Sequence, residues 1–146
     1  MHTNFYAVGP GLYQETFGLA PAHLQPGQRF VHRPGITLSQ QDNVDDALDT
    51  VNSAMIHYDA RYAEQTTWKQ PLMVSTVTLQ RLIGMTSKTF GRRRRIVRFA
   101  SLGMKRPVFG GHTLYAESEV LGVDGALVSL RTTGLNQLDE VVAQIE

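Results

Sequence analysis

A chain of 146 residues is of the size that forms one domain, and its content of 42% hydrophobic and 18% charged residues favours a packed core over disorder. Its formal net charge of +1 provides no overall field for binding DNA or an anionic membrane. The sequence has no cysteine, which excludes disulfides, thiolate metal sites and cysteine nucleophiles.

The N-terminal part, residues 1–27, is rich in glycine and proline and is predicted to be an irregular arm with one short helix. We expect residues 1–146 to form a single domain. The N-terminus lacks a basic region followed by an apolar stretch, and nowhere is there an apolar run of about 18 residues. A cytoplasmic protein that does not cross a membrane is therefore expected.

Residues 28–38 are predicted to form a strand, which Pro34 would place at an edge or a bulge. A helix should follow over residues 40–50, because Ser39 is a good N-cap and acidic residues fill the first two turns. Apolar residues recur on this helix every three or four positions, which predicts that they face the core: Val44, Leu48 and Val51.

Residues 52–59 are expected to form a loop, and Asp59 should cap a short helix around Tyr62. Pro71 suits the first position of the main helix, which is predicted over Leu72 to about Lys88. Apolar residues surround almost its whole circumference, so this helix should be buried and wrapped by another element.

The remainder of the chain alternates in a way typical of strands, and Asp124 with Gly125 predicts a two-residue hairpin turn. The expected strands cover residues 96–99, 113–123, 126–137 and 140–145. The order of elements predicts an α+β fold in which a curled antiparallel sheet is wrapped around a long central helix.

Four segments carry a resemblance to a known family: residues 26–35, 52–59, 71–79 and 107–120 with 135–137. Together they resemble the MaoC-like dehydratases and hydratases of the hotdog fold, from about residue 26 to the end. The chain looks closest to the branch that resembles mesaconyl-CoA hydratase, because of Asn52 and the start of the main helix. Two departures stand out: many relatives have Asp where this chain has Asn52, and Gly-Asp-Thr where it has Gly111-His112-Thr113.

The resemblance implies addition or removal of water across the α,β double bond of an enoyl-thioester. That chemistry needs a group that moves protons and donors that hold the developing enolate oxygen. We expect His57 to move the proton, since a histidine with an unperturbed pKa near 6.5 can take and give protons near neutrality. Asn52 cannot ionise and should position the water. Backbone amides at the start of the main helix should hold the thioester oxygen, at Val74, Ser75 and Thr76.

Simpler interpretations stand beside these. His57 could be structural, Asn52 could only close the loop, and Ser75 and Thr76 could be small residues that allow tight packing. Asp49 and Asp59 are nearby acids for which a direct catalytic role is less favoured.

The arginines of residues 92–95 form a local patch with no accompanying features of a nucleic-acid site. They are either a solvated loop or, for Arg93 and Arg94, contacts to the phosphates of coenzyme A. The other histidines lack metal-ligand spacing, so no metal is expected: His2, His23, His32 and His112. No cofactor is expected beyond the coenzyme A of the substrate.

The resemblance further implies a homodimer that binds acyl-CoA, with a small branched or dicarboxylic enoyl-CoA such as mesaconyl-CoA or itaconyl-CoA as the substrate. Cations that could meet an acidic acyl group are Arg61, Arg81 and Arg98. Two other functions remain open: a hotdog acyl-CoA thioesterase and a non-catalytic subunit that binds acyl-thioesters.

Overall fold

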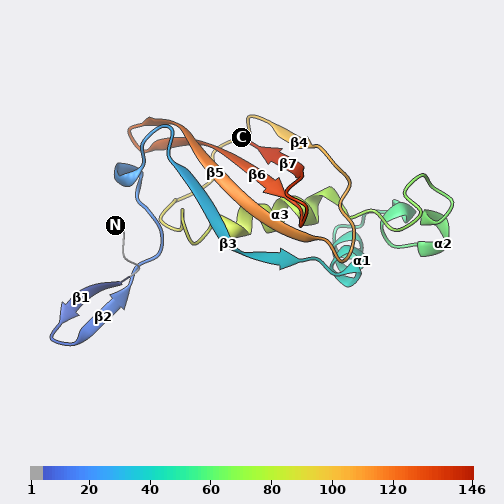
Figure 1. The fold of residues 1–146 in the computed structure, drawn as a ribbon, viewed down its shortest axis with the longest axis horizontal. Coiled ribbons are helices and arrows are strands. Elements are labelled where there is room, and N and C mark those ends of the chain that lie inside the picture. The colour runs from blue at the N-terminus through green and yellow to red at the C-terminus, as the bar shows by residue number, and fades with distance from the viewer. Residues whose placement is uncertain (1–4) are drawn as a thin grey trace.

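Alternating polar and apolar residues in the second half of the chain build most of the main sheet. In the computed structural model, which describes residues 5–146, five antiparallel strands form this sheet. Their order is β3 (Arg29–Thr37), β5 (Thr113–Asp124), β6 (Leu127–Leu135), β7 (Val141–Ile145) and β4 (Leu102–Met104) (Figure 1). Strands β3, β5, β6 and β7 confirm the four longer predicted strands to within a few residues at each end. The register of β3 with β5 shifts between His32 and Ile36, which confirms the bulge expected at Pro34.

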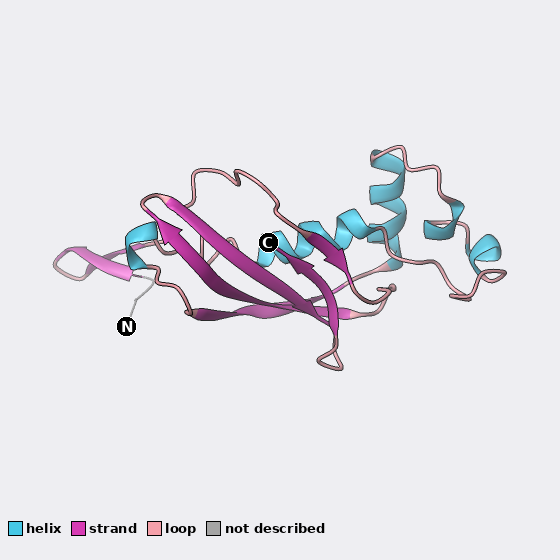
Figure 2. Cartoon of the chain, turned by 90° about the horizontal axis from the view of Figure 1, so that it is seen from above, coloured by secondary structure: helices cyan, strands magenta, loops and turns pink. Residues whose placement is uncertain are grey.

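Helix α3 (Ser75–Met85) runs along one face of the sheet, and Figures 1 and 2 show the strands curling past it. Leu82 is fully buried, and an added side chain at Gly134 of β6 would lie 2.6 Å from its Cδ1. The missing side chain therefore lets the sheet approach the helix closely. This arrangement confirms the predicted α+β class with a curled sheet around a central helix.

The main helix is shorter than predicted. It begins at Ser75 rather than next to Pro71, because Leu72 is extended and pairs with Phe109 as an isolated bridge. Its prediction as a helix enclosed on all sides is wrong for this chain by itself, since Ser75 and Thr76 are exposed. These two residues lie on the part of the first turn that the sheet does not cover.

Helix α1 (Gln40–Asp49) has the predicted cap, because the Ser39 hydroxyl accepts from the Asp42 amide at 3.0 Å. The predicted buried face is correct only in part: Val44 is half-buried, but Leu48 is 62% exposed and Val51 87% exposed. The helix instead buries Ala47 and Asn43. Ala47 lets the helix lie close to its neighbours, and Asn43 is accepted inside because its amide finds hydrogen-bond partners there.

The N-terminal arm is more regular than predicted. Strands β1 (Phe5–Gly9) and β2 (Leu12–Glu15) form an antiparallel hairpin, followed by the short 3-10 helix η1 (Pro21–His23). Residues 1–4 of the predicted irregular arm lie outside the described residues. The hairpin projects from the rest of the molecule at the end opposite to α1 (Figure 1).

Two further predictions are corrected. Residues 96–99 form no strand, because this exposed stretch has no neighbour to pair with, whereas β4 pairs with β7. The hairpin turn lies one residue later than expected, at Gly125 and Ala126, between paired Asp124 and Leu127. Gly125 has φ +55°, the left-handed conformation that such turns require. In the part of the chain that the structure describes, no helix is long and apolar enough to cross a bilayer.

Candidate active site

His57 lies on η2 (Met55–His57), a single 3-10 turn between α1 and α2 (Ala60–Ala63). The turn is closed by the His57 amide, which donates to the Ala54 carbonyl at 3.1 Å. On its other side Asp59 caps α2 as predicted, accepting from the Tyr62 amide at 2.9 Å. Two short elements therefore fix the backbone on both sides of the histidine.

The imidazole of His57 is held by the backbone. Its Nδ1 lies 2.8 Å from the Leu72 carbonyl oxygen, which can only accept, so Nδ1 carries the proton. In the neutral ring the lone pair is then on Nε2, the atom that can take a proton from water. Within residues 5–146, no hydrogen bond of Nε2 to another side chain or to the backbone is formed.

The segment that leads into the first turn of α3 is hydrogen-bonded to the turn that bears His57. The Leu72 amide donates to the Ile56 carbonyl at 3.0 Å, which ties the segment before α3 to η2. Val74 is the N-cap, and its own carbonyl accepts from Val77 at 3.1 Å. Because the first amides of a helix have no partner within the helix, Ser75 and Thr76 present N–H groups at the positive end of its dipole.

The Val74 amide is used inside the protein. It donates at 2.7 Å to the side-chain oxygen of Asn43, a residue that the sequence interpretation missed. A lone asparagine within an amphipathic helix gives no signal that it will be buried. Of the three predicted oxyanion donors, Ser75 and Thr76 are thus the ones whose amides have no protein acceptor among the described residues. The Thr76 hydroxyl donates to Asp46 of α1 at 2.7 Å.

Asn52 begins the turn that leads to His57. Its Oδ1 accepts from the Ala54 amide at 3.0 Å, the local bond typical of an asparagine that closes a loop. Its backbone amide donates to the Ala47 carbonyl at the end of α1. One further lone pair of Oδ1 and the whole Nδ2 group remain for other partners.

Three of the four segments that carry the family resemblance meet here. The Met73 amide donates to the Val108 carbonyl at 2.8 Å, and Leu72 pairs with Phe109. Phe109 contacts the rings of Trp68 and His112, with centroid distances of 6.2 and 5.4 Å. Residues 52–59, 71–79 and 107–112, distant in sequence, are therefore parts of one structure.

The predicted phosphate contacts lie elsewhere. Arg93 follows α3 and donates to the Thr86 and Ser87 hydroxyls, each at 3.3 Å, while Arg94 is exposed. No residue of 92–95 forms an ion pair within the described chain. Helix α3, with 11 residues at about 1.5 Å each, is about 16 Å long, and the arginines follow the end opposite to its first turn.

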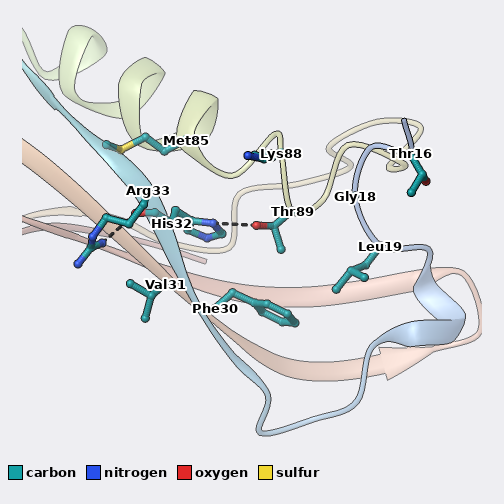
Figure 3. A pocket seen from close by; sticks show the side chains of 10 residues that line it. All are labelled: Thr16, Gly18, Leu19, Phe30, Val31, His32, Arg33, Met85, Lys88 and Thr89. Carbon is teal, nitrogen blue, oxygen red and sulfur yellow. Dashed lines mark hydrogen bonds between the residues drawn. The ribbon is translucent and has the colours of Figure 1, made fainter. Parts of the chain in front are cut away.

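A cavity of about 360 Å³ opens near the C-terminal end of α3, at Met85 (Figure 3). His32 of β3 lines it, with Nδ1 3.0 Å from the Thr89 hydroxyl and Nε2 2.8 Å from the Ser118 hydroxyl. Burial, helped by the neighbouring Arg33, lowers the pKa of His32, although Glu117 acts in the opposite direction. His32 is therefore a core residue with both nitrogens occupied, and it does not join His57. No group of residues that could hold a metal ion occurs within residues 5–146.

A family model described as a MaoC like domain matches residues 22–140. No curated protein matches the chain. Among solved structures, the R-hydratase PhaJ1 from Pseudomonas aeruginosa is similar at 22% identity, with 88% of this chain and 82% of that chain covered and a TM-score of 0.77. A MaoC-like dehydratase from Rhodospirillum rubrum is similar at 20% identity, covering 88% and 92%, with a TM-score of 0.74.

A conserved hypothetical protein from Mycobacterium tuberculosis, described as a double hotdog fold, is 23% identical, with a TM-score of 0.72. The match covers 88% of this chain and 42% of that longer one. At these identities the likeness concerns the fold, and it confirms the predicted hotdog fold.

Proposed function

Because this chain belongs to the MaoC-like dehydratase domain family, we propose that it is a hydratase or dehydratase that adds water to, or removes it from, the α,β double bond of an enoyl-thioester. One observation carries the proposal: the bond from His57 Nδ1 to the Leu72 carbonyl, in the segment that leads into α3, leaves Nε2 as the basic nitrogen. A proton-moving group and a set of free amides are the two requirements of this chemistry.

In the hydration direction, His57 Nε2 takes a proton from water while the water oxygen forms a bond to the β-carbon. The π electrons of the double bond move toward the thioester, and the negative charge on its oxygen is held by the Ser75 and Thr76 amides. The imidazolium then returns the proton to the α-carbon, so one histidine serves as base and acid. Asn52 holds the attacking water through the groups of its amide that the turn does not use.

The acyl group that we propose is small and branched or dicarboxylic, as in mesaconyl-CoA or itaconyl-CoA. A second carboxylate needs a cation, and the three arginines considered differ in their surroundings. Arg81 already pairs with Asp42 at 3.0 Å, and Arg98 lies in the exposed stretch after α3. Arg61 is exposed on α2, two residues after the N-cap Asp59. Of the three arginines it is the nearest in sequence to His57.

We also propose that two copies pair, as the sequence resemblance implied. Strand β3 is an edge of the main sheet, and it exposes Val31 by 59% and Ile36 by 37%. An open edge with apolar side chains tends to be covered by another chain. Light scattering should give twice the mass of 16.2 kDa; a monomer at working concentration would contradict the pairing.

The test of the activity is a panel of crotonyl-CoA, mesaconyl-CoA and itaconyl-CoA, followed by the absorbance of the conjugated thioester and by thiol release. Loss of conjugation without free thiol is the expected result, and the best substrate identifies the acyl group. Release of free thiol would replace the proposal by a thioesterase. No reaction with any of the three would favour a subunit that binds acyl-thioesters without turning them over.

A further inference from the structure

Asn43 is a fully buried polar residue at the junction of α1, η2 and α3. Its Oδ1 accepts from the Val74 amide at 2.7 Å. Its Nδ2 donates to the carbonyl of His57 at 2.7 Å and to the carbonyl of Leu72 at 3.0 Å. One side chain therefore connects the backbone of the histidine with the backbone that starts α3.

The partners settle which way the amide points. A backbone N–H must face an acceptor and two carbonyls must face donors, so the oxygen lies toward Val74 and the nitrogen toward His57 and Leu72. Gln40, one helical turn earlier, supports the same carbonyl of His57 with its Nε2 at 2.8 Å. Every strong hydrogen-bonding group of the Asn43 amide is used, as a buried polar side chain requires.

The Leu72 carbonyl is the point where this network meets the imidazole. It accepts one bond from Asn43 Nδ2 and another from His57 Nδ1. Asn43 thus holds both the main chain of the histidine and the oxygen that fixes its ring. A shift of this carbonyl would move the ring and release its tautomer.

We infer that Asn43 is a positioning residue. It holds the proton-transferring Nε2 of His57 in a fixed position relative to the first turn of α3. The inference rests on the proposed function for its effect on turnover. Asn43 does not touch the reacting atoms, because it is fully buried and acts through backbone groups. It also occupies the Val74 amide, which assigns the thioester oxygen to Ser75 and Thr76.

Two substitutions test the role. Asn43→Asp keeps the shape and the bond from the Val74 amide, but an ionised carboxylate has no donor for the two carbonyls. Asn43→Ser leaves a shorter side chain, whose single hydroxyl cannot donate to both carbonyls. The matched control is Gln41→Ala on the same helix, where the lost bond is an exposed one to Asp45.

For both Asn43 variants we expect kcat to fall by about 10- to 100-fold, since small misplacements of catalytic groups cost rates of this order. KM should stay within about threefold, because ground-state contacts are kept. In Asn43→Asp the deficit should grow as pH rises, since the protonated carboxyl restores one donor and the buried carboxylate restores none. The kcat is taken per folded molecule, because ionisation of the buried carboxyl would also lower stability as pH rises. Gln41→Ala should behave as the parent.

Nitrogen-15 NMR of the imidazole rings provides a readout that needs no substrate, with the His57 signals assigned from a His57→Gln variant. The parent should carry its proton on Nδ1, and Asn43→Ser should show a mixture of tautomers. Folded variants with the parent's tautomer and parent kcat would overturn the inference. If the parent turns over no enoyl-thioester, the proposed function fails, and the ring spectrum alone then decides whether Asn43 positions His57.

Discussion

The imidazole Nδ1 of His57 donates to the carbonyl of Leu72 at 2.8 Å, across a separation of 15 residues. This bond joins the turn that bears the histidine to the extended segment that starts α3. Because a carbonyl can only accept, the bond also selects which ring nitrogen is basic. The geometry on which the proposed mechanism depends is thus set by a side chain and a backbone group from two separate parts of the sequence.

Replacing His57 by alanine should lower the hydration rate by about 10²- to 10⁴-fold, the usual contribution of a positioned acid or base. The fold should persist, because the lost ring makes one bond to a backbone carbonyl. Initial rates on the best enoyl-CoA and a thermal melt measure the two effects. His23→Gln, on η1, is the matched control and should keep the parent rate. Undiminished turnover by His57→Ala would remove this residue from the mechanism.

Asn52→Asp should change the pH dependence of kcat, because it adds a titrating group where the proposed mechanism places the water. The fold should be unaffected, since a carboxylate can accept from the Ala54 amide as the parent amide oxygen does. The measurement is a full pH–rate profile of both proteins. Superimposable profiles would mean that Asn52 only closes the turn and does not contact the reacting water.

Replacing Arg93 and Arg94 together by glutamine should raise KM for a CoA thioester by about tenfold, if each arginine contributes part of a phosphate contact. The same enoyl group on pantetheine, which lacks the nucleotide, should show no change. Arg106→Gln is the control, since this arginine is exposed and pairs only loosely with Glu140 at 3.7 Å. An equal KM for the CoA thioester in all three proteins would identify residues 92–95 as a solvated loop.

Gly134→Ala should destabilise the protein by about 1–3 kcal/mol, the usual cost of overpacking a core. The new methyl group would lie 2.6 Å from Cδ1 of Leu82, which is fully buried, so the leucine side chain or the sheet would have to shift within the core. Gly122→Ala in β5 is the matched control, because nothing lies within 4 Å of its added carbon. Urea unfolding compares the two variants; equal stabilities would show that the sheet can shift away from α3.

Stability should fall as the solution becomes acidic below about pH 6.5, the unperturbed pKa of histidine, and His32 should contribute to this fall. Burial lowers the pKa of His32 in the folded state, so the unfolded chain takes up a proton first. The stabilisation is complete above the unfolded value and is lost as pH drops toward the folded one. His32→Gln should flatten this part of the curve of unfolding free energy against pH. An unaltered slope would show that other groups cause it.

Much of the fold could be predicted from local patterns. The alternation of residues 113–145 predicted three strands. The cap at Ser39 predicted where α1 begins, and Pro34 predicted an irregular strand. Each of these signals is a property of a few neighbouring residues: side-chain period, cap chemistry or a missing amide donor. The prediction failed for residues 96–99, since a strand also needs a partner, and pairing is not a local property.

The sequence by itself determined which side chains are present for the proposed hydration chemistry: His57, Asn52 and the small residues at the start of α3. Only the tertiary structure decided which nitrogen of His57 is basic and which amides of α3 stay free. Both were decided by Asn43 and by the Leu72 carbonyl, whose hydrogen bonds span 14 to 31 residues of the chain. A helical pattern identifies which residues share a face, but the partners that a buried amide will find depend on how the elements pack.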